Sequence, residues 1–222
     1  MREYMSAYQR LLRMPPVFSI NTLARATGLP RASAKVLLAR WVAKQMAESA
    51  GPRSGVYFNR VVDRDGTSAH AVQALMMKYP SATLCGASVL HSAGWTTQIP
   101  STLHVAVEAR ASYAKLDGVT LHPCWRSWFQ FMQQQGAFTE SGDAATADSM
   151  ATYGLRARAP AWALADLYAD PSARSWKPDE SDLDLPQAAL PELRRACLAL
   201  RCEPPAGILE RRPRRTSRKE IA

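Results

Sequence analysis

The side chains best suited to chemistry in this sequence are arginines and lysines, and they are concentrated near its N-terminus. Residues 1–60 contain ten Lys or Arg against two Glu, whereas residues 61–207 contain twelve basic and fifteen acidic side chains. Residues 208–222 contain six basic side chains against two Glu. Cationic groups gathered in one short region are typical of phosphate binding, whereas a solubilising surface would spread them evenly. The distribution therefore predicts nucleic-acid binding by the first sixty residues.

Two helices joined by a tight turn are expected to position these charges. Ser19 or Asn21 can cap a short helix that ends at Gly28, a residue suited to a left-handed conformation. Leu29 and Pro30 then form the turn, because proline is accepted at the start of a helix. This pattern is typical of a helix-turn-helix, whose second helix contacts DNA with its N-terminal side chains.

The second helix is predicted to bury one apolar stripe. Four residues at positions i, i+3, i+4 and i+7 form it: Ala34, Leu37, Leu38 and Trp41. We predict that six polar or basic side chains around this helix contact DNA, two of them (Arg25 and Arg40) at phosphates: Arg25, Arg31, Ser33, Lys35, Arg40 and Arg53. A helical hairpin with solvated charges, or a protein-interaction module, would have the same local pattern. The uneven charge distribution favours DNA.

A short hairpin is predicted after these helices. Residues 46–49 and 56–58 have strand patterns, and the loop between them is rich in Gly, Pro and Ser. Arg53 lies at the tip of this loop, where it can meet phosphate or the minor groove. Residues 2–14 also have the apolar spacing of a helix, which Pro15 and Pro16 end. Three helices followed by a hairpin are the element order of a winged helix-turn-helix, which we assign to residues 1–62.

Residues 68–207 are expected to form a second domain. Helical and strand patterns alternate along it, with helices predicted over residues 69–78, 84–92, 125–132, 161–169 and 191–201. Strands are predicted over residues 102–107, 119–121 and 155–159. The chain is therefore expected to be an α+β protein, with an N-terminal winged helix-turn-helix and a C-terminal mixed α/β domain. Residues 208–222 are predicted to be a disordered basic tail, because they have almost no apolar content.

Residues that could support catalysis are few. His122 and Cys124 would share one face of a strand and could in principle pair, although an ordinary strand end also explains them. Glu108, Arg110 and Asp117 are the one group that could form the metal site of a nuclease, but the lysine that such sites commonly use is absent. We therefore predict no catalytic residue and no enzyme activity, with a DNA-associated nuclease as the least favoured alternative.

Metal, cofactor and membrane sites are not predicted. The four cysteines contain no C-x₂-C pair, and no segment approaches the about 20 apolar residues of a membrane helix. The N-terminus lacks the apolar stretch of a signal peptide. We therefore expect a cytoplasmic protein that binds no metal ion or cofactor and does not contact a membrane.

Several short segments of the second domain have sequences distinctive enough to compare with a known protein family. Residues 80–82 (PSA) lead into a helix that contains residues 88–94 (SVLHSAG), and residues 96–100 (TTQIP) and a strand over residues 103–107 (LHVAV) follow. Residues 160–166 (PAWALAD) form a further helix after a strand. Together with the predicted winged helix, these segments resemble the AbiEi antitoxin family, and the resemblance covers roughly residues 5–170.

The resemblance implies a bacterial antitoxin of the abortive-infection, type IV toxin–antitoxin class. In that family the N-terminal domain binds inverted repeats in its own promoter and represses the operon, and the C-terminal domain counters a partner toxin with a nucleotidyltransferase fold. The implied partners are promoter DNA and this toxin, with the antitoxin monomeric in solution or assembling cooperatively on DNA. The chain departs from the family at Gln45, which stands where glycine is frequent at the end of the second helix. A stand-alone winged-helix regulator that responds to a ligand or partner is the alternative.

Overall fold

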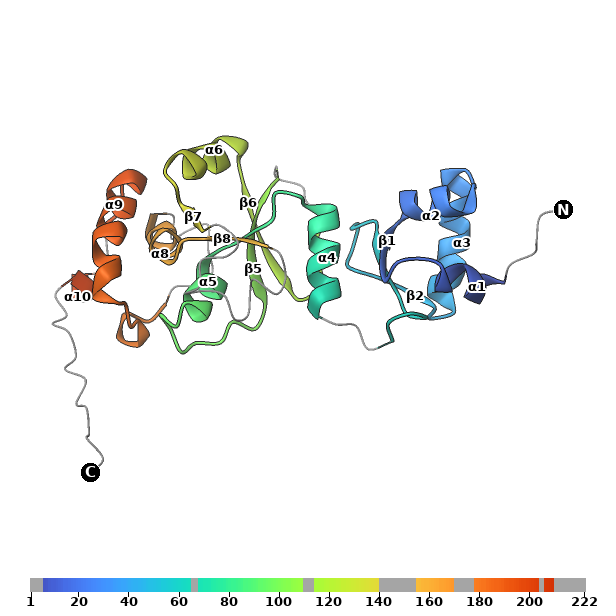
Figure 1. Cartoon of the computed structure of the whole chain (residues 1–222), viewed down its shortest axis with the longest axis horizontal. Coiled ribbons are helices and arrows are strands. Elements are labelled where there is room, and N and C mark those ends of the chain that lie inside the picture. The colour runs from blue at the N-terminus through green and yellow to red at the C-terminus, as the bar shows by residue number, and fades with distance from the viewer. Residues whose placement is uncertain are drawn as a thin grey trace, which may run out of the picture. The chain divides into compact units, whose positions relative to one another are not determined.

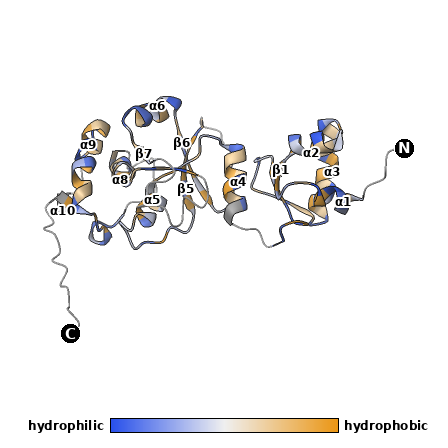
Figure 2. Ribbon diagram, in the orientation of Figure 1, coloured by the Kyte–Doolittle hydropathy of each residue, from blue (hydrophilic) through white to orange (hydrophobic). Residues whose placement is uncertain are grey.

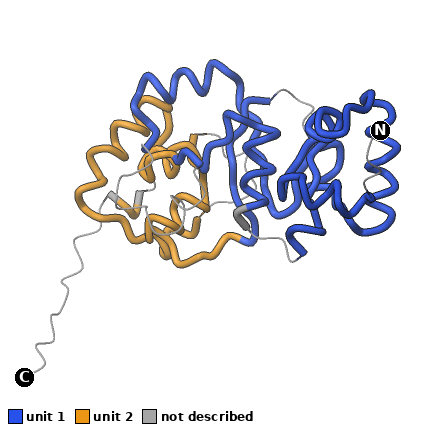
Figure 3. The backbone as a smooth tube through the Cα atoms, turned by 45° about the vertical axis from the view of Figure 1, so that its right-hand side comes forward, with its two compact units in different colours: residues 1–84, 101–157 blue, residues 85–100, 158–222 orange. Residues whose placement is uncertain are grey.

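The described part of the chain contains helices and two β-sheets, which confirms the predicted α+β class (Figure 1). The computed structural model describes residues 6–64, 68–109, 114–139, 155–169, 178–203 and 206–209. Two compact units are present, one formed by residues 1–84 and 101–157 and the other by residues 85–100 and 158–222 (Figure 3). The first unit thus combines the predicted N-terminal domain with strands that the sequence assigned to the second. Among the described helices, none has the length and apolar character needed to cross a bilayer.

Residues 6–60 form three helices and a three-stranded antiparallel sheet. The elements follow one another as α1 (Ala7–Leu12), β1 (Val17–Ser19), α2 (Ile20–Thr27), α3 (Arg31–Ala43), β2 (Ala47–Ser49) and β3 (Val56–Asn59). Strand β3 lies in the middle of the sheet and pairs with β1 on one side and β2 on the other. The predicted helix pair and hairpin are present, but the sequence did not predict the three-residue strand β1.

Local side-chain hydrogen bonds set the ends of helix α2. The Ser19 hydroxyl accepts the backbone N–H of Thr22 at 3.1 Å, and the Thr22 hydroxyl accepts the N–H of Ser19 at 3.4 Å. This reciprocal capping makes Ser19, rather than Asn21, the first flanking residue of the helix. Gly28 ends the helix with a φ of 66°, the left-handed conformation expected from the sequence.

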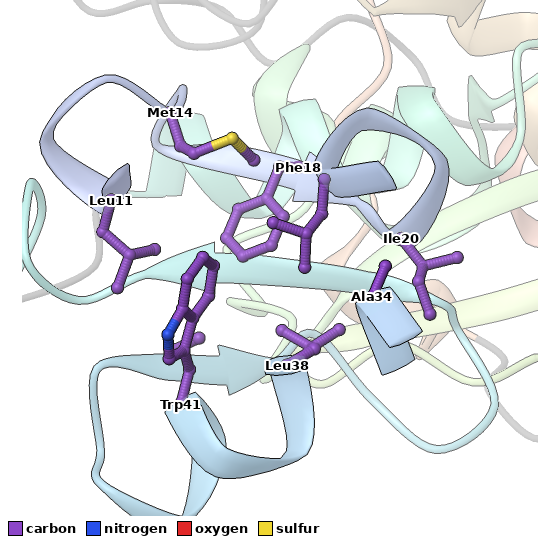
Figure 4. Close-up of a cluster of buried hydrophobic side chains, with 9 residues drawn as sticks. Leu11, Met14, Phe18, Ile20, Ala34, Leu38 and Trp41 are labelled. Carbon is purple, nitrogen blue, oxygen red and sulfur yellow. The ribbon is translucent and has the colours of Figure 1, made fainter. Parts of the chain in front are cut away.

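Helix α3 is held to the sheet by one buried face. Trp41, Leu38 and Ala34 point from it into a cluster with Phe18 of β1 and Leu23 of α2, as Figure 4 shows for the labelled members. All five side chains are buried. Burial of a large aromatic side chain contributes about 2–3 kcal/mol, so this cluster is the main attachment of α3.

The buried amide of Asn59 ties helix α1 to the same core. Its Nδ2 donates to the carbonyl oxygen of Leu11 at 2.8 Å and to that of Met14 at 3.3 Å. Its Oδ1 accepts the N–H of Val61 at 3.2 Å. The side chain of Asn59 thus binds carbonyl groups at the C-terminal end of α1, where a helix leaves its last carbonyl oxygens without hydrogen-bond partners.

A five-stranded mixed sheet lies in the first unit. Its strands are β4 (Thr83–Leu84), β5 (Leu103–Glu108), β6 (Val119–Cys124), β7 (Phe138–Thr139) and β8 (Arg156–Arg158), and their order in the sheet is β6-β5-β4-β8-β7. The helices of this part of the chain are α4 (Ser68–Lys78) and α6 (Arg126–Gln134). Strand β5 runs parallel to β6 and antiparallel to β4. The helix predicted over residues 84–92 was wrong at its start, because Thr83 and Leu84 pair with β5 as a strand. Helix α4 packs on β1 and β3.

The second unit is mainly helical. It contains α5 (Gly86–Ser92), α8 (Pro160–Ala169), the short 3-10 turns η2 (Glu180–Asp182) and η3 (Gln187–Ala189), α9 (Leu190–Leu200) and α10 (Ala206–Leu209). Helix α8 packs against both α5 and α9 and is buried on all sides over residues 161–167. Helix α10 buries Ile208, so regular structure continues past the predicted start of the tail at residue 208. Residues 210–222 lie outside the described ranges.

The TTQIP segment binds the acidic stretch near residue 182. The hydroxyls of Thr96 and Thr97 donate to the Asp182 carboxylate at 2.6 and 2.5 Å, and the N–H of Asp184 donates to the carbonyl of Trp95 at 2.9 Å. Thr96 also accepts the N–H of Gln98, the kind of turn bond that the sequence suggested. Hydrogen bonds from Thr96 and then Thr97 lower the pKa of Asp182. The segment therefore has a structural role within the second unit.

A buried ion pair joins the end of β8 to helix α8. The Arg158 guanidinium donates to the Asp166 carboxylate, and both side chains are almost completely buried. Breaking a buried pair on one side leaves an uncompensated charge in a poorly solvated interior, which costs far more than losing an exposed pair.

Asp166→Asn should therefore lower the free energy of unfolding by about 3–5 kcal/mol. Urea denaturation followed by far-UV circular dichroism measures this loss. The control is Glu192→Gln, which removes one partner of the exposed Arg195–Glu192 pair at 3.5 Å and should cost less than about 1 kcal/mol. Equal losses in the two variants would contradict the role given to burial.

Candidate nucleic-acid interface

The six side chains predicted to contact DNA are all exposed. Four of them lie on α3 (Arg31, Ser33, Lys35 and Arg40), Arg25 lies on α2, and Arg53 lies in the loop between β2 and β3. The five basic side chains of this set form no hydrogen bond or ion pair with other residues of the described ranges. Arg60 differs from them, because Glu48 binds its guanidinium at 2.7 Å. Five cationic groups near the start of the chain are therefore available to a ligand.

The polar residues of α3 lie along two flanks of the helix. Arg31 and Lys35 are four residues apart and share one flank. Ser33, Arg40 and Lys44 have spacings of seven and four residues and share the other. Lys44 is exposed and was not among the predicted contacts, although this spacing could have indicated it.

Helix α3 ends in a left-handed residue although no glycine is present. Gln45 has a φ of 55°, its N–H donates to the carbonyl of Val42 at 2.9 Å, and the N–H of Met46 donates to that of Trp41 at 3.0 Å. This is the hydrogen-bond pattern with which glycine usually ends a helix. Gln45 adopts it at a cost of about 1 kcal/mol, and the chain enters β2 two residues later.

The loop that carries Arg53 is anchored within the first unit. Gly51 has a φ of 146°, and a Cβ atom at this position would lie 2.4 Å from the carbonyl oxygen of Lys115. The N–H of Asp117 donates to the carbonyl of Ala50 at 3.1 Å. Arg53 itself has a φ of 58° and an exposed side chain. The close backbone contact holds the base of the loop while its tip stays open to solvent.

Gly51→Ala should destabilise the protein by about 2 kcal/mol, because the new methyl group would overlap backbone atoms, which cannot move aside as the end of a flexible side chain could. The matched control is Gly55→Ala in the same loop, where φ is 69° but no atom lies within 4 Å of the added Cβ. It should cost about 1 kcal/mol, from backbone strain alone. Thermal unfolding of both variants compares them, and a smaller loss for Gly51→Ala would contradict the contact with Lys115.

The carboxylates of the possible nuclease site do not come together. Glu108 ends β5, whereas Asp117 lies just before β6, and the two strands run parallel with Leu103 opposite Val119. Asp117 therefore lies beside the start of β5, whereas Glu108 is at its other end, about 17 Å away along the strand at the usual rise per residue. Arg110 lies outside the described residues.

The contacts described for His122 and Cys124 are a hydrogen bond through the backbone and a ring stack with a second histidine. The Cys124 thiol donates to the backbone carbonyl of His122 at 3.5 Å. The His122 ring stacks on that of His104, with Nδ1 of His104 3.1 Å from Nε2 of His122, and burial lowers the pKa of His104. Across the described residues, no group of three or more His, Cys, Asp or Glu side chains could hold a metal ion.

Comparison with known proteins gives one weak structural likeness to report. No protein-family model and no curated protein sequence matches the chain. The crystal structure of the Rv2827c protein from Mycobacterium tuberculosis superposes on it with a TM-score of 0.48 and 15% sequence identity. The match covers 86% of this chain and 66% of that protein, so the chain spans less than two thirds of the length of that protein. A likeness at this level identifies neither a family nor a function.

Proposed function

We propose that residues 1–62 are a winged helix-turn-helix that binds double-stranded DNA through α3. The order α1, β1, α2, α3, β2, β3 with a three-stranded sheet supports this proposal. The observation that carries it is the set of exposed basic side chains on both flanks of α3, without acidic residues on that helix.

The dimensions of an α-helix favour the major groove as the binding site. A helix with side chains is about 10–12 Å across, and the major groove is about 12 Å wide. With α3 in the groove, Arg31 and Lys35 face one phosphate backbone and Arg40 faces the other. Ser33 lies in the first turns of the helix, where base edges are contacted. Arg53 then reaches phosphate or the adjacent minor groove from the loop, and Arg25 reaches phosphate from α2.

We propose further that the protein is an antitoxin and autorepressor like those of the AbiEi family. It binds inverted repeats in the promoter of its own operon, and the remainder of the chain counters a nucleotidyltransferase toxin encoded beside it. The segments that resemble this family support the proposal, together with the basic surface of α3.

Arg31→Ala combined with Lys35→Ala should abolish the shift of a promoter fragment in an electrophoretic assay at moderate salt. Where residual binding is measurable, the slope of log Kd against log salt should be smaller by about 2, because two phosphate contacts are lost.

Arg126→Ala combined with Arg194→Ala removes two exposed charges elsewhere and is the charge-matched control, for which binding should be unchanged. Equal weakening by both pairs would show a general charge effect and contradict the role of α3. A wild-type affinity that does not depend on salt would contradict DNA binding through phosphates.

Neutralisation is tested with the full-length chain, because the first unit contains both the basic surface and the five-stranded sheet. Expression of the adjacent nucleotidyltransferase should arrest growth, and co-expression of the wild-type chain should restore it. The Arg31→Ala, Lys35→Ala double variant, expressed from an unrelated promoter, should restore growth equally. Failure of the wild-type chain to restore growth would contradict the antitoxin proposal and leave DNA binding unaffected.

A further inference from the structure

Helix α3 has a second apolar stripe, which faces away from the core. Its members follow the spacing i, i+4, i+7 and i+11, and all are exposed: Ala32, Val36, Ala39 and Ala43. Val36 is the largest of them, and 55% of its surface is accessible to solvent. Figure 2 shows hydrophobic colouring along much of this helix.

This arrangement differs from that of an ordinary surface helix. An amphipathic helix that packs on a core usually has charged residues at the centre of its solvent face. Here the core face is formed by Ala34, Leu38 and Trp41, and the centre of the opposite face is also apolar. The charges are displaced to the two flanks. The outer stripe is therefore suited to an apolar surface that lies between two rows of negative charge.

The DNA major groove has this combination of features. Phosphates line both of its edges, and the thymine C5-methyl is the apolar group that base pairs present on its floor. A second copy of this chain is a poorer occupant, because the flanks of two such helices would bring together Arg31, Lys35 and Arg40 from each copy.

We propose that Val36, with Ala32 one turn before it, contacts thymine methyl groups and so gives the protein a preference for thymine at defined positions of its site. The inference rests on the proposed DNA binding through α3. Ala32 and Val36 lie in the N-terminal half of the helix, the part that reaches base edges in helix-turn-helix proteins. They have no side-chain donor or acceptor, so hydrophobic contact is the interaction that they can make there.

The test uses the full-length protein and a duplex that it has itself selected from a library of random sequence. Fluorescence anisotropy compares this duplex with one in which deoxyuridine replaces every thymidine, so that only the methyl groups are removed. The wild type should bind the uracil duplex more weakly, by about fourfold for each contacted methyl. Val36→Ala should reduce this ratio toward one, mainly by weakening binding to the thymine duplex.

Arg40→Ala is the matched control on the same helix. It should weaken binding to both duplexes by the same factor and leave their ratio at the wild-type value, because its contact is to phosphate. Equal binding of the two duplexes by the wild type, or a ratio unchanged by Val36→Ala, would overturn the methyl contact while leaving DNA binding in place.

Two further outcomes have distinct meanings. If no duplex is enriched and none is bound, the proposed DNA binding itself fails. If wild-type protein without DNA sediments as a dimer and Val36→Ala sediments as a monomer, a second copy occupies the stripe and the inference is wrong.

Discussion

The burial of one face of α3 is the constraint on which the N-terminal region depends. Trp41 and Leu38 can enter the core beside Phe18 in only one rotation of the helix. Once this rotation is fixed, the periodicity of the helix determines the direction of every other side chain on it. The two basic flanks and the outer apolar stripe are therefore consequences of the same packing that stabilises the fold.

Features set by nearby residues could be predicted from the sequence. The spacing of Ala34, Leu38 and Trp41 identified the buried face of α3, and Gly28 identified the end of α2. The exposure of the four candidate contacts on α3 (Arg31, Ser33, Lys35 and Arg40) followed from the same periodicity, since a side chain off the buried stripe faces solvent. The outer stripe headed by Val36 could have been found by the same reading of α3, because its spacing is equally regular.

Features that join distant residues could not be predicted. Strand β4 has only two residues, too few for a periodic pattern, and it exists because Leu84 pairs with Val105. Thr96 and Asp182 are 86 positions apart, and the sequence around either one does not indicate the other. The distance between Glu108 and Asp117 likewise depends on strands β5 and β6 being parallel, and the ten residues that connect these strands do not specify their relative direction.

The contact of Gly51 with Lys115 has a consequence for how the chain can be divided or recombined. A winged helix-turn-helix, the domain that we propose for residues 1–62, is usually regarded as a module that can be moved between proteins. In this chain the loop bearing Arg53 rests on backbone contributed from beyond the five-stranded sheet's strand β5. A fusion that carried only residues 1–62 would leave this loop without its support. The smallest segment that could be transferred to another protein with the loop intact therefore also includes the backbone around Lys115.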